Sequence, residues 1–287
     1  MGAVERGELG RNCRYAMTFR HNTDIGQNFL IDKSVVEWMM ARAGLGPCDR
    51  VLEIGPGSGI LTKGILESGC AGLDAIEIDT RLKEYLEPIA AADSRLALHW
   101  GDAVRFDYAA LARSPTHVIA NLPYHITTPV LWKLFEAASE NLSYMLVMTQ
   151  AEAALRLSCG AGARESNPLS ITLSAMGSAE VARKVSRTAF RPAPRVDSAI
   201  VEIRFAAPGE RRGLPNGKIW RRLLSGSFAT RRKTLVNNWK ASFGMTRELA
   251  LETLAKHSLG GMSRPEELSL GDWLALSRDE NMAGHIA

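Results

Sequence analysis

The stretch RVLEIGPGSG, residues 50–59, decides the fold that we expect for this chain. Its first five residues, 50–54, are mostly apolar and predict a short buried strand. The glycine-rich residues 55–59 predict a tight turn, and a helix is expected from Ile60 to Ser68. A strand, a glycine turn and a helix in direct succession are typical of the first unit of an α/β fold.

The same alternation continues on both sides of this stretch. Because strands that alternate with helices run parallel, we expect a mostly parallel sheet that is covered on both faces. The last two strands, 181–186 and 199–205, are expected as an antiparallel, hairpin-like pair joined by the proline-containing loop 190–197. The other strands are expected at 73–78, 96–100, 116–120 and 144–149, and helices at 35–43, 81–92, 128–138 and 150–157 and from about Pro168.

The strand pattern stops after Pro208-Gly209, and only helical periodicity follows. Helices are expected at 219–228, 232–242, 247–256 and 266–277. We therefore expect three parts: an N-terminal arm at 1–23 that is disordered, an α/β domain at 24–207 and a small all-helical domain at 208–287.

Composition narrows the class of protein. The chain has 287 residues, of which 46% are hydrophobic and 23% charged, as in an ordinary soluble globular protein. The first twenty residues contain no apolar segment of the kind found in a secretory signal. The four cysteines are widely spaced without a nearby histidine, so neither a disulfide framework nor a metal site is expected, and the reducing cytoplasm is the expected location.

Positive charge is concentrated in one region. Residues 181–240 contain 15 Lys or Arg and 3 Asp or Glu, a net charge of +12, while the rest of the chain has a net charge of −8. A run of this kind can be a solvated basic face, but so strong an imbalance favours binding of a polyanion.

The spacing of the glycines separates two kinds of cofactor. Gly55, Gly57 and Gly59 follow the strand, and the third glycine comes one place too early for the dinucleotide pattern. The turn therefore favours the smaller adenosyl group. Glu77, near the end of the second strand, can accept both ribose hydroxyls, and Asp102, after the third, can accept from an adenine amine.

The tetrapeptide Asn121-Leu122-Pro123-Tyr124 follows the strand expected at 116–120. The carboxyl ends of parallel strands are where open α/β sheets bind ligands. Pro123 holds the preceding backbone extended, so a side-chain amide and a backbone carbonyl can accept hydrogen bonds beside an aromatic ring. This arrangement suits a planar heterocycle with an exocyclic amine, although a turn with a packed aromatic residue fits the same four residues.

With these motifs in this order, the chain resembles the S-adenosylmethionine-dependent ribosomal RNA adenine dimethyltransferases over about residues 19–275. The resemblance also rests on GQNFL at 26–30, LEIGPG at 52–57, FRPAPRVDS at 190–198 and FATRRKTL at 228–235. The last two segments are more similar to the small-subunit enzymes than to the relatives that methylate large-subunit RNA and confer antibiotic resistance. The family resemblance implies a Rossmann-like methyltransferase sheet with helices on both faces and a small all-helical C-terminal domain.

The resemblance also assigns roles. It implies that S-adenosylmethionine, which leaves as S-adenosylhomocysteine, binds in the 24–207 domain without a metal, and that 208–287 binds RNA. Asn121, Leu122, Pro123 and Tyr124 are the expected catalytic residues. Tyr124 and Phe190 are expected to stack on the target base, although Phe190 can equally be core. The expected cofactor site consists of Asn28, Leu30, Gly55, Gly57, Glu77, Asp102 and Asn121, and the expected phosphate contacts are Arg221, Arg222, Arg231, Arg232 and Lys233.

The expected function is dimethylation of adjacent adenosines in small-subunit ribosomal RNA, by a monomer acting on a precursor particle away from membranes. Three alternatives remain open. A DNA adenine methyltransferase shares the chemistry but usually has Pro in place of Leu122. The others are a large-subunit methyltransferase of the antibiotic-resistance type and a non-catalytic ribosome-assembly factor.

Overall fold

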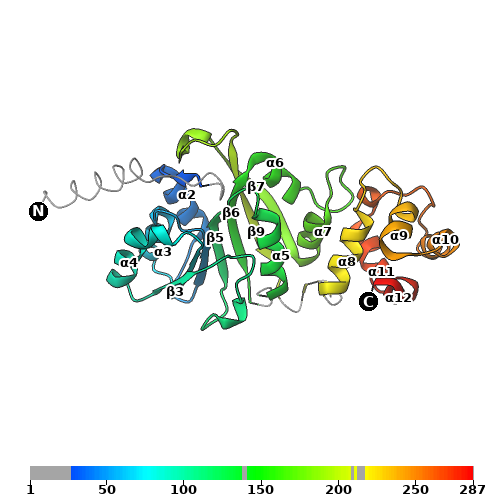
Figure 1. Cartoon of the computed structure of the whole chain (residues 1–287), viewed down its shortest axis with the longest axis horizontal. Coiled ribbons are helices and arrows are strands. Elements are labelled where there is room, and N and C mark those ends of the chain that lie inside the picture. The colour runs from blue at the N-terminus through cyan, green and yellow to red at the C-terminus, as the bar shows by residue number, and fades with distance from the viewer. Residues whose placement is uncertain (1–26, 138–140, 208–209, 212–216, 287) are drawn as a thin grey trace, which may run out of the picture. The chain divides into compact units, whose positions relative to one another are not determined.

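The computed structural model describes residues 27–137, 141–207, 210–211 and 217–286, so the arm predicted for residues 1–23 lies outside the described part of the chain. The α/β fold is confirmed: a seven-stranded sheet has the order β4-β3-β2-β5-β6-β9-β7, with helices on both sides (Figure 1). The strands are β2 (Arg50–Ile54), β3 (Gly72–Glu77), β4 (Leu96–Trp100), β5 (His117–Asn121), β6 (Tyr144–Gln150), β7 (Gly177–Val185) and β9 (Ser198–Phe205).

The central strands create a crevice where the direction of chain progression reverses. β2 pairs in parallel with β3 on one side and with β5 on the other. The chain moves outward from β2 through β3 to β4 and then returns to β5, which continues in parallel to β6. At such a switch point, the connections at the carboxyl ends of β2 and β5 diverge and leave room for a ligand.

Most strand predictions are correct to within a residue, and the differences have local causes. The strand expected at 50–54 is confirmed as β2. β3 begins one residue earlier than expected because Gly72 pairs with Arg50, and it ends at Glu77 before the half-exposed Ile78. β7 begins at Gly177, four residues earlier than expected, where the backbone lies so close to Arg204 that a side chain would not fit.

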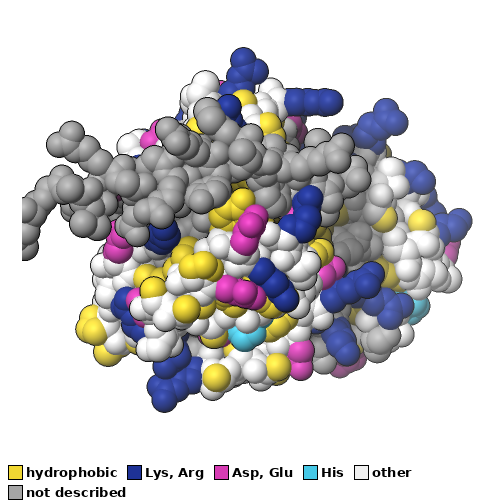
Figure 2. Space-filling model, turned by 60° about the vertical axis from the view of Figure 1, so that its left-hand side comes forward, with side chains coloured by type: hydrophobic (Ala, Val, Ile, Leu, Met, Phe, Trp, Pro, Cys, Tyr) yellow, Lys and Arg dark blue, Asp and Glu magenta, His cyan; other side chains and the backbone are white. Residues whose placement is uncertain are grey.

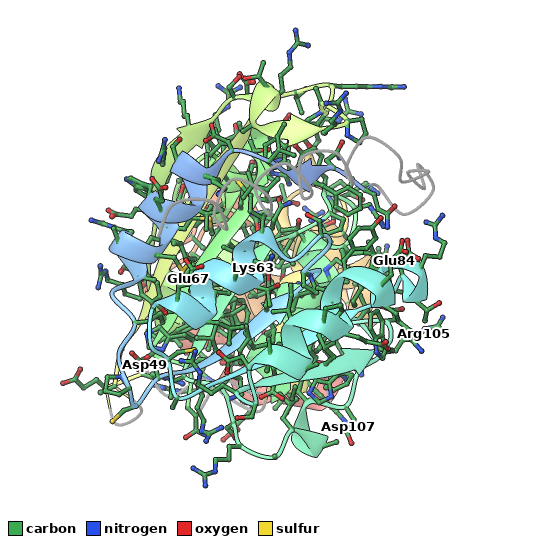
Figure 3. All side chains as sticks on the ribbon, turned by 90° about the vertical axis from the view of Figure 1, so that its left-hand side faces the viewer. Asp49, Lys63, Glu67, Glu84, Arg105 and Asp107 are labelled. Carbon is green, nitrogen blue, oxygen red and sulfur yellow. The ribbon has the colours of Figure 1, made fainter. Side chains whose placement is uncertain are left out.

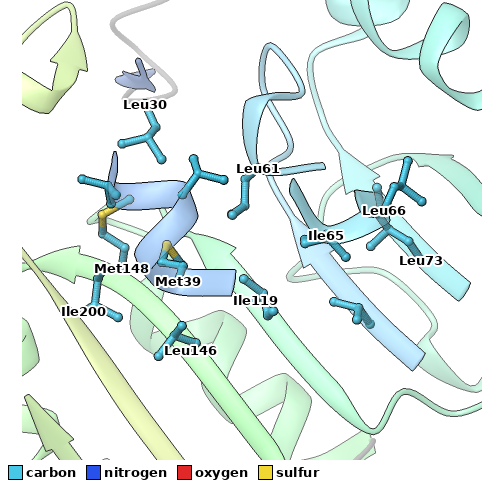
Figure 4. Close-up of a cluster of buried hydrophobic side chains, with 14 of the residues drawn as sticks. Leu30, Met39, Leu61, Ile65, Leu66, Leu73, Ile119, Leu146, Met148 and Ile200 are labelled. Carbon is cyan, nitrogen blue, oxygen red and sulfur yellow. The ribbon is translucent and has the colours of Figure 1, made fainter. Parts of the chain in front are cut away.

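Helices α2 (Lys33–Ala43) and α3 (Ile60–Glu67) share one hydrophobic core with the sheet. Met39, Ile65 and Leu146 meet in this core (Figure 4). Asp32 caps the start of α2, since its side chain accepts a hydrogen bond of 2.9 Å from the Ser34 N–H. The remaining helices between the parallel strands are α4 (Lys83–Ala92) and α5 (Thr127–Ala137), and α6 (Ala151–Leu157) follows β6. Within the described ranges, no helix has both the length and the apolarity needed to cross a membrane.

Two short strands lie outside the main sheet. β1 (Phe29–Leu30) pairs antiparallel with β8 (Phe190–Arg191), and Leu30 lies opposite Phe190. The loop that was expected only to join two strands therefore also binds the segment that precedes α2. This ladder brings two motifs together that are about 160 residues apart in the sequence.

The chain packs as two compact units with boundaries after Ala154, Glu180 and Glu202, whereas the sequence analysis expected a boundary between 207 and 208. Unit 1 comprises Met1–Ala154 and Val181–Glu202, and unit 2 comprises Leu155–Glu180 and Ile203–Ala287. Unit 2 includes α7 (Pro168–Met176) because Ile171 and Ala175 pack into a core with Trp220, Trp239 and Trp273. The other helices of unit 2 are α8 (Gly217–Ser227), α9 (Leu235–Phe243), α10 (Arg247–Lys256), α11 (Leu270–Leu276) and α12 (Glu280–Ile286).

Two helix predictions in unit 2 need correction, and one helix was missed. The helix expected at 232–242 begins only at Leu235, because Thr234 is extended at the N-cap position. The helix expected at 266–277 is a 3₁₀ turn (Pro265–Glu267) followed by α11, which begins where Ser269 and Asp272 form a capping box. Helix α12 was not predicted.

Candidate active site

A cavity of about 410 Å³ lies at the carboxyl ends of the central strands in unit 1. It is lined by the ends of β2, β3 and β5, by β1 and by one residue of β8, so segments distant in sequence converge on it. Every predicted cofactor, catalytic or base-stacking residue lies on its wall: Asn28, Leu30, Gly55, Gly57, Glu77, Asp102, Asn121, Leu122, Pro123, Tyr124 and Phe190.

The glycine turn after β2 requires its glycines. Gly55 and Gly57 have φ values of 69° and 58°, in the left-handed region where other residues are strained. A Cβ atom on Gly57 would also lie 2.9 Å from Cδ1 of Phe29. The turn is tied to the neighbouring strand because the Gly57 N–H donates to Oε2 of Glu77 at 3.2 Å.

Glu77 is the buried acid at the end of β3, with 6% of its surface exposed. Its Oε1 accepts a hydrogen bond of 2.9 Å from the Asp79 N–H, so backbone groups hold both carboxylate oxygens in place. Burial raises the pKa of Glu77, although these two N–H donors oppose the shift. A ligand that donates hydrogen bonds here would favour the charged carboxylate.

Glu53 is a cavity residue that the sequence analysis did not single out. It is 1% exposed, its Oε2 accepts a 2.7 Å hydrogen bond from the Thr62 hydroxyl, and its Oε1 has no partner among the described residues. Burial, together with the nearby charge of Glu77, raises the pKa of Glu53 to about 8. The signal was present in the sequence as a lone acid inside the apolar strand before the glycine turn.

Asp102 follows β4 and lies on the cavity wall, where it is more open to solvent than Glu77. Its Oδ1 accepts from the Val104 N–H at 2.9 Å, and its Oδ2 lies 3.7 Å from Nε of Arg105. The Arg105 side chain points away from the molecule (Figure 3). Asp102 therefore retains acceptor capacity toward the cavity.

Asn121 is the last residue of β5, and its amide has a defined orientation. Its Nδ2 donates to the Asn28 carbonyl at 3.3 Å, which leaves Oδ1 available as an acceptor on a residue that lines the cavity. The next residue is fixed as well, because the Leu122 N–H donates to the Met148 carbonyl at 2.9 Å. Hydrogen bonds therefore hold both residues that carry the predicted acceptors, at the end of β5 and directly after it.

Two aromatic rings line the same cavity. The Tyr124 hydroxyl lies 2.9 Å from Oγ of the buried Ser198, a partner that the sequence analysis did not identify. Burial raises the pKa of Tyr124, so its hydroxyl stays neutral in the ordinary pH range. Phe190 is 4% exposed and belongs to the hydrophobic core cluster while also lining the cavity.

The predicted phosphate-binding residues form a separate set in unit 2. Arg221 and Arg222 are exposed on α8. Arg231, Arg232 and Lys233 are exposed in the turn before α9, although Arg232 and Lys233 were expected to begin a helix. Arg231 donates to the Arg164 carbonyl and to Glu165, so part of its charge is already compensated. Among the residues that the structure describes, no three or more His, Cys, Asp or Glu side chains cluster as metal ligands would.

Comparison with known proteins gives consistent similarities. A model of the family described as ribosomal RNA adenine dimethylase matches residues 18–278. The ribosomal RNA small subunit methyltransferases A of Rubrobacter xylanophilus and Lactobacillus delbrueckii subsp. bulgaricus are 39% and 36% identical, and the matches cover 91% and 92% of this chain and 95% and 92% of theirs. The crystal structure of a dimethyladenosine transferase from Plasmodium falciparum superposes with a TM-score of 0.73 at 25% identity, over 86% of this chain and 95% of that one.

Proposed function

The chain belongs to the ribosomal RNA adenine dimethylase family, and we propose that it dimethylates the exocyclic amines of adjacent adenosines in small-subunit ribosomal RNA with S-adenosylmethionine as methyl donor. It is a methyltransferase, and small-subunit RNA is the substrate of the curated relatives that cover about nine-tenths of it. The observation that carries the proposal is the amide of Asn121, which Asn28 holds with its oxygen free at the cavity.

The cavity fits S-adenosylmethionine in size and charge. Its volume of about 410 Å³ lies in the range of small-molecule sites. A ligand that carries positive charge would favour the ionised forms of Glu53 and Glu77, two acids whose pKa values burial raises. We propose that Asn28, Leu30, Gly55, Gly57, Glu77 and Asp102 hold the cofactor, with Glu77 toward the ribose hydroxyls and Asp102 toward the adenine amine. When bound, the cofactor supplies an electrophilic methyl group on a sulfonium centre.

The residues of the chain supply the position of the nucleophile. The lone pair of the adenine amine is delocalised into the ring, so the amine attacks poorly in its planar form. Acceptance of its two N–H bonds by Oδ1 of Asn121 and the Leu122 carbonyl favours a pyramidal nitrogen whose lone pair points at the methyl group. The amine nitrogen becomes cationic as the new N–C bond forms, and its proton leaves afterwards without a dedicated base.

The target adenine must leave its stack before it can enter the cavity. Tyr124 and Phe190 line the cavity, and we propose that they stack on the base, which is worth about 1–3 kcal/mol per base. We further propose that Arg221, Arg222, Arg231, Arg232 and Lys233 contact RNA phosphates, which contributes affinity and not base identity. The enzyme is proposed to act in the cytoplasm, as a monomer, on a precursor of the small subunit.

The decisive experiment is mass spectrometry of both ribosomal RNAs from cells with and without the gene. We expect N6-dimethyladenosine to disappear from small-subunit RNA only. Loss from large-subunit RNA would support the resistance-type alternative. No change in either RNA, together with impaired small-subunit assembly, would support a non-catalytic assembly factor.

A further inference from the structure

One segment of unit 1 carries only positively charged residues among its charged side chains. Residues 181–196 contain Arg183, Lys184, Arg187, Arg191 and Arg195 and no Asp or Glu. In residues 27–154, the other part of unit 1, Lys and Arg are interspersed with Asp and Glu along the sequence, and Figure 2 shows side chains of both charges on the face that it displays. The segment comprises the end of β7, a 3₁₀ turn (Arg187–Ala189), β8 and the loop that leads to β9.

This segment includes part of the cavity wall. Phe190 lines the cavity and is buried, whereas Arg191, the next residue of β8, is exposed. Because successive side chains of a strand point to opposite sides, Arg191 is directed away from the cavity at a Cα position about 3.8 Å from that of Phe190. A nucleotide whose base reached Phe190 would bring its phosphates close to this segment.

The backbone of the segment is held in place, and its charges are not neutralised. Oδ1 of Asp197, the first acid after the segment, accepts from the backbone N–H of Arg187 at 2.9 Å, and its carbonyl accepts from the Ala151 N–H at 3.0 Å. Arg183 packs over the Trp38 ring. None of Lys184, Arg187, Arg191 and Arg195 forms an ion pair with any described residue, whereas Arg42, Arg81 and Arg95 in the same unit each pair with an acid.

Unpaired cationic side chains, on a segment that contributes Phe190 to the cavity wall, match the chemistry of a nucleic-acid backbone. We propose that Lys184, Arg187, Arg191 and Arg195, the cavity-edge cations, bind the phosphates that flank the adenosine entering the cavity. This inference rests on the proposed function and adds a second RNA contact to the one in unit 2. The two contacts have separate tasks: the cavity-edge cations position the target nucleotide, and the unit 2 set contributes affinity.

The test uses the full chain and a fluorescent RNA hairpin with two adjacent adenosines in its loop. The variant is R191A/R195A, and the matched control is K63A/R113A, which removes two exposed cations from unit 1 that lie outside the segment. Binding is measured by anisotropy from 50 to 300 mM KCl. Since each lost phosphate contact reduces the log–log salt slope by about 0.7–0.9, we expect a slope flatter by about 1.5 for R191A/R195A and unchanged for the control.

Further measurements distinguish this proposal from misfolding, from loss of cofactor binding and from failure of the proposed function. Affinity for S-adenosylhomocysteine and the melting temperature should match the wild type, and the KM for RNA should rise about tenfold with little change in kcat. R191K/R195K, which keeps the charges, should retain the wild-type slope. An unchanged slope in folded R191A/R195A overturns the proposal even if the wild type methylates the hairpin. If the wild type binds the hairpin with the expected salt dependence but methylates neither the hairpin nor small-subunit precursor particles from cells without the gene, the proposed function fails and the binding surface stands.

Discussion

Each packing unit contains an acid that is almost completely buried, and the two acids differ in how they are satisfied. In unit 2, Asp279 is 4% exposed and accepts hydrogen bonds of 2.9 Å from Nζ of Lys256, Nε2 of His257 and the Asn281 N–H. In unit 1, Glu53 is 1% exposed and has the Thr62 hydroxyl as its partner, while its second oxygen has none among the described residues.

The difference is visible in the direction of the two pKa shifts. Burial favours the protonated form of both acids. The donors around Asp279 outweigh burial and lower its pKa, whereas burial dominates at Glu53 and raises its pKa to about 8. Full hydrogen bonding joins α10 to the start of α12 and indicates a structural role. An unsatisfied acid on a cavity wall indicates a place that a ligand completes.

The comparison predicts that polar groups of the unit 1 cavity affect function more than stability, and replacing Asn121 is the severest test. We expect N121A to lose methyl transfer by at least a hundredfold, because the amine would lose one of two acceptors that position it. Affinities for S-adenosylhomocysteine and RNA and the melting temperature should stay close to those of the wild type. The matched control is N237A, an exposed asparagine on α9. Single-turnover transfer within tenfold of the wild-type rate would contradict the role of Asn121.

Glu77 tests the cofactor side of the same cavity. E77Q keeps the size of the side chain and removes the charge that strengthens its hydrogen bonds, a loss of about 1.5–3 kcal/mol or roughly 10–100-fold in cofactor affinity. Isothermal titration calorimetry with S-adenosylhomocysteine measures the effect. E67Q, on the solvent-exposed side of α3, is the control (Figure 3). Equal affinity of E77Q and wild type would mean that Glu77 only braces the glycine turn.

The cavity residues were easier to predict from the sequence than the contacts between distant parts of the chain. The cavity residues were found because the positions after β2, β3, β4 and β5 are fixed by strand ends, and parallel strands bring those ends together. Topology thus converts a local pattern into a three-dimensional site. Phe190 reaches the cavity through its pairing with Leu30, and the family resemblance, not periodicity, identified it.

The rest depends on contacts between distant residues that leave no periodic signal. Residues 155–180 belong to unit 2 because α7 packs beside Trp220, whose indole N–H donates to Thr172 at 2.9 Å. The partner of Tyr124 lies 74 residues away, at Ser198. Arg231 was predicted as a phosphate contact, and its ion pair with Glu165 is visible only in the folded chain.

Stability as a function of pH tests the two buried acids directly. The folded protein keeps a proton on Glu53 that the unfolded chain releases, so the free energy of unfolding should fall as pH rises from about 4.5 to about 8. E53Q has no such proton. The melting temperature of E53Q minus that of the wild type should therefore increase by several degrees from pH 5 to pH 8. Both proteins are compared without cofactor by differential scanning calorimetry.

D279N should show the opposite dependence. Because the pKa of Asp279 is lowered in the folded state, its stabilisation is present above pH 3.8 and is lost as pH falls through the folded value. Between pH 5 and pH 8 the melting temperature of D279N should therefore lie below that of the wild type by a constant amount. Parallel curves for E53Q and wild type over this range would mean that Glu53 is ionised when folded, and the contrast between the two acids would fail.

The smallest effect is expected at the hydrogen bond between Tyr124 and Ser198. Like Asp279 in unit 2, the Tyr124 hydroxyl already has a partner within the protein. Removing one such hydrogen bond costs about 0.5–1.5 kcal/mol. Because the Tyr124 ring would then be positioned less precisely, we expect a twofold to tenfold loss in kcat/KM for RNA. S198A and Y124F remove the same bond from its two ends. If the bond acts only by holding the ring, the double variant S198A/Y124F should lose no more than either single variant. Losses that add in the double variant would mean that each hydroxyl has a separate function. A loss well above tenfold in Y124F alone would mean that the Tyr124 hydroxyl takes a direct part in methyl transfer.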